Sequence, residues 1–122
     1  MRVFIGPYSD GSSEQEIKVE IDNHDTWNLD YTLAQIIYPA LVRLKEFKKG
    51  IPSVNESDLP ENLKSDNLFD PKNWEWVLDE MIFAFKCISE DDAGGWDWPK
   101  SDRDRIYNGL RLFGVYYTAL WW

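Results

Sequence analysis

The sequence of 122 residues contains a single cysteine, Cys87, and a single histidine, His24. One cysteine excludes an internal disulfide and any metal site built from several cysteines. Basic residues are also scarce, and the net charge of −9 argues against binding to nucleic-acid phosphates or anionic lipid. No apolar run approaches the roughly 18–20 residues of a membrane span, and the chain does not begin with a basic segment followed by an apolar one. The sequence therefore predicts a soluble, cytosolic protein that needs no cofactor and no metal.

Aromatic residues are abundant, at 16%, and seven of them are tryptophans. The apolar share of 43% is normal for a globular protein, and the length suits one compact domain over residues 1–122. Acidic residues are concentrated in the middle of the chain, because residues 51–100 hold 12 acidic and 4 basic side chains. An acidic surface over residues 56–92 is therefore expected, and we expect it to influence which partners the protein meets.

The first 22 residues predict two β-strands. Residues 2–8 begin with β-branched and aromatic side chains and are then broken by Gly6-Pro7, and residues 16–22 alternate without a fault between polar and apolar side chains. The turn composition between these segments favours an antiparallel hairpin. Because an isolated hairpin is only marginally stable in water, we expect other elements to cover its apolar face.

Three amphipathic segments predict helices, at about residues 28–49, 71–88 and 102–120, each with apolar residues at intervals of three and four. Asp70 followed by Pro71 is a strong signal for the start of the second helix. Residues 51–70 read as a polar connector on the surface, and Trp27, Trp74 and Trp121 are expected to enter the core. The predicted fold is an α+β domain in which an N-terminal antiparallel hairpin packs against three helices.

The loop before the third helix is the first candidate for a binding site. It contains the acidic run Glu90, Asp91 and Asp92, followed by Trp96 and Trp98. Exposed tryptophans are typical of protein-binding hot spots, so these five residues are predicted to contact a partner protein. The same aromatic residues can also stack on a base. The alternative is a pocket for a small nucleotide, made by Trp98 with Arg103, Arg105 and Arg111.

A second cluster, made of Asp22, His24, Asp25 and Asp30, raises the alternative of a carboxylate-based hydrolase or a metal site. The residue types also suit the N-terminus of the helix that follows, and that interpretation is favoured. No second histidine is present to complete a two-histidine ligand set. We therefore predict no catalytic residue and no metal ligand, and an enzyme is the less favoured class.

Three stretches carry a resemblance to a known group: Asp25–Pro52 (DTWNLDYTLAQIIYPALVRLKEFKKGIP), Trp76–Phe85 (WVLDEMIFAF) and Arg105–Trp121 (RIYNGLRLFGVYYTALW). They resemble a family of uncharacterised tailed-bacteriophage accessory proteins. The resemblance implies synthesis in the cytoplasm of an infected bacterium. The expected function is non-enzymatic: to bind and block or sequester a host component, in particular one of antiviral defence. A homo-oligomer is compatible with these features, and so is a virion component.

Overall fold

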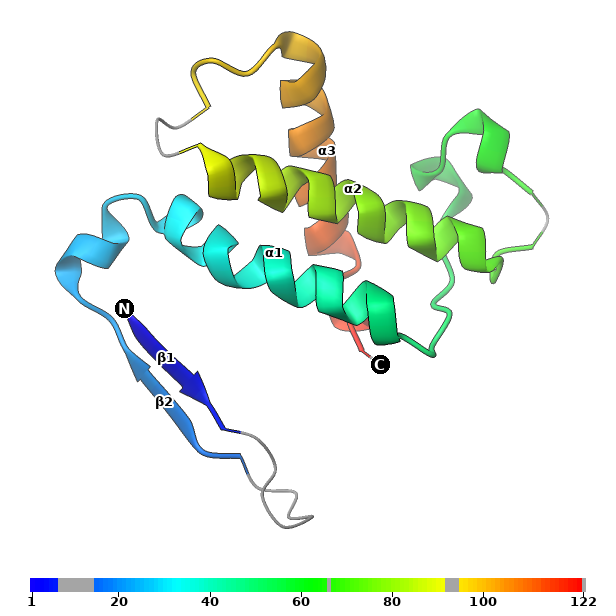
Figure 1. Ribbon diagram of the computed structural model, residues 1–122. Coiled ribbons are helices and arrows are strands. Elements are labelled where there is room, and N and C mark those ends of the chain that lie inside the picture. The colour runs from blue at the N-terminus through cyan, green and yellow to red at the C-terminus, as the bar shows by residue number, and fades with distance from the viewer. Residues whose placement is uncertain (7–14, 66, 92–94, 122) are drawn as a thin grey trace.

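The computed structural model describes residues 1–6, 15–65, 67–91 and 95–121 of the chain. Strands β1 (Arg2–Ile5) and β2 (Ile17–Glu20) form an antiparallel hairpin, and helices α1 (Leu29–Phe47), α2 (Pro71–Glu90) and α3 (Lys100–Val115) follow (Figure 1). The α+β fold class is therefore confirmed. Residues 7 and 8 of the first predicted strand lie outside the described residues.

The helix boundaries follow local signals in the sequence. Asp70 caps α2 by accepting a hydrogen bond from the backbone N–H of Lys72, and Pro71 occupies the first helical position, as predicted. Helix α3 ends at Val115 rather than near residue 120, because the chain then tightens into a 3₁₀ turn at Tyr117–Ala119. Further 3₁₀ turns lie at Asn23–Thr26, Glu56–Asp58 and Glu61–Leu63.

Helix α2 is central, because it packs against both α1 and α3 (Figure 1). It carries most of the core, and its fully buried apolar residues are Trp74, Val77, Leu78, Met81 and Ala84. The α2–α3 crossing is close at Gly109, where an added Cβ would lie 2.4 Å from the Glu80 carbonyl oxygen and 2.7 Å from the Ala84 Cβ. A glycine at this position therefore sets the distance between the two helices.

The connector between α1 and α2 is anchored in the core rather than merely lying on the surface. Val54 and Leu59 are buried, at 1% and 5% exposure. Asp58 accepts hydrogen bonds from the Tyr116 hydroxyl, at 2.7 Å, and from Arg111 Nη1, at 2.8 Å. Burial and the Asp58 hydrogen bond together raise the pKa of Tyr116 to about 12. This network ties the connector to the end of α3.

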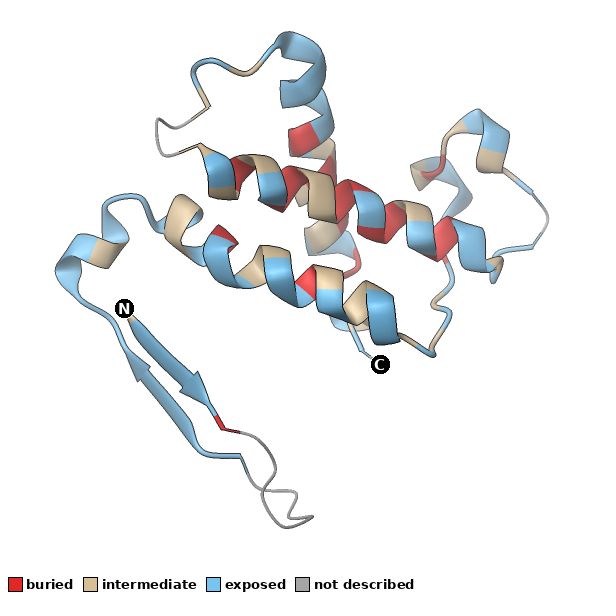
Figure 2. Cartoon of the chain, in the orientation of Figure 1, coloured by how far each residue is buried: buried red, intermediate tan, exposed pale blue. Residues whose placement is uncertain are grey.

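The apolar face of the hairpin was expected to be covered by helices, but it is exposed. All residues of β1 and β2 are exposed (Figure 2), and the exposure of Val3, Ile5, Ile17 and Val19 ranges from 41% to 63%. The hairpin is held by its end, where the Met1 amino group lies 2.8 Å from Asp25 Oδ2. Its apolar face is thus largely open to solvent in the single chain.

The predictions for the core tryptophans were correct at one position and wrong at two. Trp74 is 1% exposed, but Trp27 is 78% and Trp121 is 56% exposed. Trp27 packs against the His24 ring, at 4.6 Å between centroids, in the turn that precedes α1. Trp121 lies against Gly50, where an added Cβ would be 2.7 Å from the indole ring. Both indoles therefore contact residues near the ends of α1 rather than the core.

Candidate binding site

The two tryptophans of the loop before α3 have different environments. Trp98 is half-buried against the hydrophobic core, whereas Trp96 is 88% exposed. The loop can place Trp98 there because Gly95 has a φ of +84°, a conformation that favours glycine. An added Cβ at Gly95 would also lie 2.6 Å from the Trp98 ring. Trp98 thus has a structural role, and Trp96 is the indole available to a partner.

Trp96 lies beside two further side chains of the types that dominate protein-binding hot spots. Together with Gly95, the residues Trp96, Arg103 and Tyr107 line an open cavity of about 260 Å³. Tyr107 is 59% exposed. The Arg103 guanidinium is held near the loop, because its Nη2 donates a hydrogen bond to the Trp98 carbonyl oxygen at 3.4 Å. An aromatic surface with one positioned cation results.

A second, apolar cavity of about 290 Å³ adjoins this surface, since Tyr107 lines both. All three helices and the loop contribute to its walls. The apolar and aromatic lining residues are Leu33, Ile37, Phe85, Ile88, Trp98, Ile106, Tyr107, Leu110 and Phe113. Among the described residues that line it, Asp30 is the charged one. The two cavities together offer an aromatic surface beside an apolar hollow, which is a common composition for a binding site.

Acidic side chains gather at the same end of α2 and α3. Glu90 is the last residue of α2, Asp91 caps that helix at its C-terminus, and Asp102 is in the first turn of α3. Burial raises the pKa of the Cys87 thiol, and the carboxylates of Asp102 and Glu90 raise it further. Both carboxylates therefore act on the same thiol. Asp92, the remaining predicted acidic residue, lies outside the described residues.

The three arginines of the nucleotide alternative do not converge on Trp98. Arg105 forms a bidentate ion pair with Glu80, with its shortest N–O distance at 2.6 Å, and its guanidinium stacks on Phe83 at 3.7 Å. This hydrogen bond raises the pKa of Arg105. Arg111 pairs with Asp58 in the connector. Arg103 is the member of the set that lies beside Trp98.

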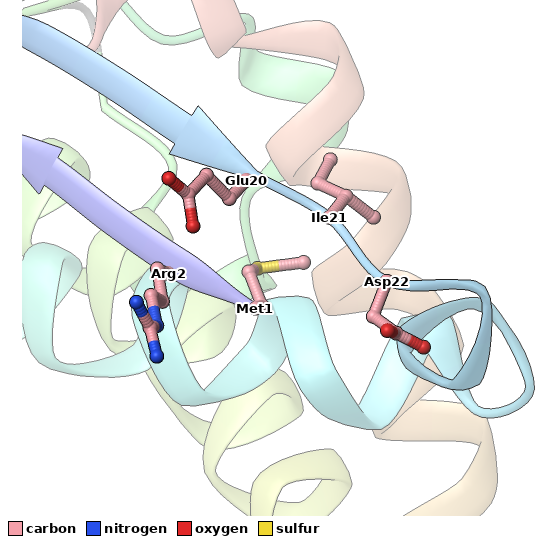
Figure 3. Close-up of a pocket in the computed structure, with 5 residues that line it drawn as sticks. All are labelled: Met1, Arg2, Glu20, Ile21 and Asp22. Atoms are coloured by element: carbon pink, nitrogen blue, oxygen red, sulfur yellow. The ribbon is translucent and has the colours of Figure 1, made fainter.

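The carboxylates near His24 have structural partners. The Asp22 side chain accepts from the Asp25 backbone N–H, and the Asp25 side chain accepts from the Asp22 N–H at 2.7 Å, which together make a capping box for the 3₁₀ turn. Asp22 also accepts from the His24 backbone N–H at 2.9 Å. The hydrogen bond from the Met1 amino group lowers the pKa of Asp25. Figure 3 shows a shallow pocket where Asp22 meets the open end of the hairpin.

No group of three or more His, Cys, Asp or Glu side chains able to hold a metal ion occurs in residues 1–6, 15–65, 67–91 and 95–121. Within the same part of the chain, no helix is long and apolar enough to cross a membrane.

Sequence reasoning missed Tyr107 as a site residue. A signal was present, because Tyr107 follows the buried Ile106 and therefore falls off the apolar stripe of the third helix. An aromatic residue off the core stripe is a candidate for partner contact. The sequence does not show that Tyr107 lies close to Trp96, since this proximity depends on how the loop packs on α3.

The fold and this surface define a small α+β domain with a candidate binding surface formed by the loop before α3 and by α3 itself. Comparison with protein-family models, with curated proteins and with solved structures finds no match.

Proposed function

We propose that this protein is a non-enzymatic bacteriophage accessory protein that binds a host component in the bacterial cytoplasm and blocks or sequesters it. A component of antiviral defence is the proposed target. The phage assignment rests on the sequence resemblance of the three helical stretches. The binding assignment rests on one observation, which is that Trp96, Arg103 and Tyr107 surround an open cavity, with Trp96 88% exposed.

This observation supports a protein partner because Trp, Tyr and Arg are the residues most enriched at binding hot spots. When a partner covers an indole exposed to this extent, the buried apolar area stabilises the complex by about 25 cal/mol per Å². The adjoining apolar cavity offers a hollow for a side chain of the partner. The site thus combines an exposed indole, which a partner can cover, with an apolar cavity, which can receive a side chain of the partner.

The charge around the site favours a basic partner, such as a host protein that itself binds nucleic acid. Asp97 lies between the two tryptophans in the sequence and is exposed, as are Glu90 and Asp102. Exposed carboxylates on the loop and on the adjoining helix ends steer a basic protein toward this part of the surface and raise the association rate at low salt. The net charge of −9 acts in the same direction.

The alternatives have less support from the geometry. A nucleotide pocket would need arginines near Trp98, and Arg105 and Arg111 are instead engaged with Glu80 and Asp58. A carboxylate hydrolase would need free carboxylates at the His24 cluster, where Asp25 and Asp22 bind backbone N–H groups. The protein-binding proposal uses side chains that face solvent.

The test is affinity capture from a lysate of the bacterial host, followed by binding measurements on the captured component. Trp96→Ala and Tyr107→Ala should each weaken binding at least tenfold, which corresponds to about 1.4 kcal/mol. Trp27→Ala is the matched control, because Trp27 is similarly exposed but lies before α1. This control should bind like the parent.

Salt and native mass spectrometry separate the partner classes. With a basic protein partner, the association rate should fall as salt rises, and Asp97→Lys or Glu90→Lys should reduce it further. Recovery of a nucleotide in the native mass spectrum would instead favour the alternative. Binding that is unchanged by both Trp96→Ala and Tyr107→Ala would refute the proposed site.

A further inference from the structure

The exposed hairpin carries an interaction surface that is separate from the proposed partner site. In its register Val3 lies opposite Val19 and Ile5 opposite Ile17. These side chains share one face of the hairpin, because directly opposed residues point to the same side of a sheet. Extending the register places Met1 opposite Ile21, so this face is apolar along its whole length.

The hairpin lies with this apolar face on the side of α1. Val3 of β1 and Ile36 of α1 line one apolar cavity of about 380 Å³, together with Met1, Tyr31, Thr32 and Gln35. Ile36 is 43% exposed. Apolar side chains thus face this gap from both the hairpin and the helix, and a two-stranded sheet is too narrow to bury them.

The β2 strand has an edge that is open for pairing. The sheet of the described residues has two strands, and in Figure 1 β2 is drawn on the side of the hairpin away from α1. The Gly6 N–H donates to the Glu16 carbonyl at 2.6 Å, which makes that pair a hydrogen-bonded one. Because such pairs alternate along antiparallel strands, Lys18 and Glu20 direct their backbone groups toward β1. Ile17, Val19 and Ile21 direct theirs toward the open edge.

The sequence of β2 is complementary to itself in one antiparallel register. When two copies pair about Val19, Val19 lies opposite Val19 of the second copy and Ile17 opposite Ile21. Lys18 then lies opposite Glu20, twice by symmetry, so that opposite charges meet on the polar face within β2. Glu16 and Asp22 lie opposite each other in this register, but both are outside the strand. Pairing about Lys18 would instead place Lys18 opposite Lys18 and Glu16 opposite Glu20. Like charges thus disfavour that neighbouring register.

We propose that this chain forms a symmetric dimer in which the β2 strands of two copies pair antiparallel about Val19. The result is a four-stranded sheet with the order β1–β2–β2–β1. Its apolar face is twice as wide as in one chain, and both α1 helices flank it. An open, self-complementary strand edge beside an exposed apolar face is the observation that carries the proposal.

The test is sedimentation velocity of the full-length protein over a series of concentrations. The parent should show a concentration-dependent monomer–dimer equilibrium. Lys18→Glu places Glu opposite Glu20, and Glu20→Lys places Lys opposite Lys18, so each variant alone should raise the dissociation constant about tenfold. A mixture of the two variants should form heterodimers about as well as the parent, because both cross-strand pairs are then of opposite charge.

Lys72→Glu is the control for net charge, since Lys72 is exposed in the first turn of α2 and has no part in the hairpin. It should dimerise like the parent. Far-UV circular dichroism verifies that the helices persist in every variant. Amide hydrogen exchange gives a measurement without substitution, because the Val19 N–H should be protected at high concentration and exchange rapidly at low concentration.

Three outcomes would overturn the proposal. The parent could remain monomeric at every concentration, and this would overturn the proposal even if β2 paired with a strand of another protein. The mixed variants could fail to associate. Glu20→Lys could strengthen the dimer, which would indicate pairing about Lys18, where Lys at position 20 meets Glu16.

Discussion

Gly109 gives the sharpest test of how the helices pack. An alanine there would place its Cβ 2.4 Å from the Glu80 carbonyl oxygen and 2.7 Å from the Ala84 Cβ. Neither neighbour can rotate away, because the oxygen belongs to the α2 backbone and Ala84 is fully buried. Relief of the clash therefore requires α2 and α3 to move apart.

Two opposing effects determine the expected change in the free energy of unfolding. Replacing glycine by alanine inside a helix stabilises it by about 1 kcal/mol. Overpacking a core contact destabilises by about 1–3 kcal/mol, and a contact with backbone belongs at the upper end. We expect Gly109→Ala to lower the free energy of unfolding by about 1–2 kcal/mol.

Gly114 is a matched control in the same helix, because an added Cβ there meets no atom within 4 Å. Only the propensity effect should act, and Gly114→Ala should raise the free energy of unfolding by about 0.5–1 kcal/mol. Urea unfolding followed by circular dichroism measures both, with equal m-values as the check for a common unfolded state. Equal or greater stability of Gly109→Ala than of the parent would refute the close crossing of α2 and α3.

Three further predictions concern contacts between distant parts of the chain. Tyr116→Phe should lower the free energy of unfolding by about 1–2 kcal/mol at pH 7, because it removes the hydrogen bond to Asp58. Folding raises the pKa of Tyr116 from 10.0 to about 12, so the stability difference between Tyr116→Phe and the parent, measured by urea unfolding, should shrink above pH 10 and disappear near pH 12. Arg105→Ala should destabilise by about 1–3 kcal/mol by leaving the Glu80 carboxylate without its cation, and Glu80→Gln in the same background should recover part of the loss in thermal unfolding. Trp98→Ala should lower the unfolding free energy by about 2 kcal/mol through lost core packing, and an unchanged melting temperature would contradict the half-buried placement of this indole.

The candidate site could be predicted in part. The loop composition pointed to Trp96 and Trp98 as a pair, because aromatic residues in a polar loop are unusual. Which indole packs inward does not follow from the sequence, since it depends on the positive φ of Gly95 and on the space beside Ile106 and Phe113. Arg103, Arg105 and Arg111 are close in sequence, but the carboxylates that bind Arg105 and Arg111 lie 25 and 53 residues away from them.

The sequence alone determined the two strands and where α2 begins, because these signals act over a few residues, whereas the end of α3 and the 3₁₀ turns did not follow from it. The alternation of Ile17, Val19 and Ile21 specifies a strand, and the cap of Asp70 with Pro71 specifies where α2 begins. Tertiary structure decided which of these apolar faces are covered. The α2 stripe meets α1 and α3 and is buried, while the equally apolar hairpin face stays open in the single chain. Periodicity states that a face is apolar, but burial depends on contacts between segments far apart in sequence, and local pattern does not encode them.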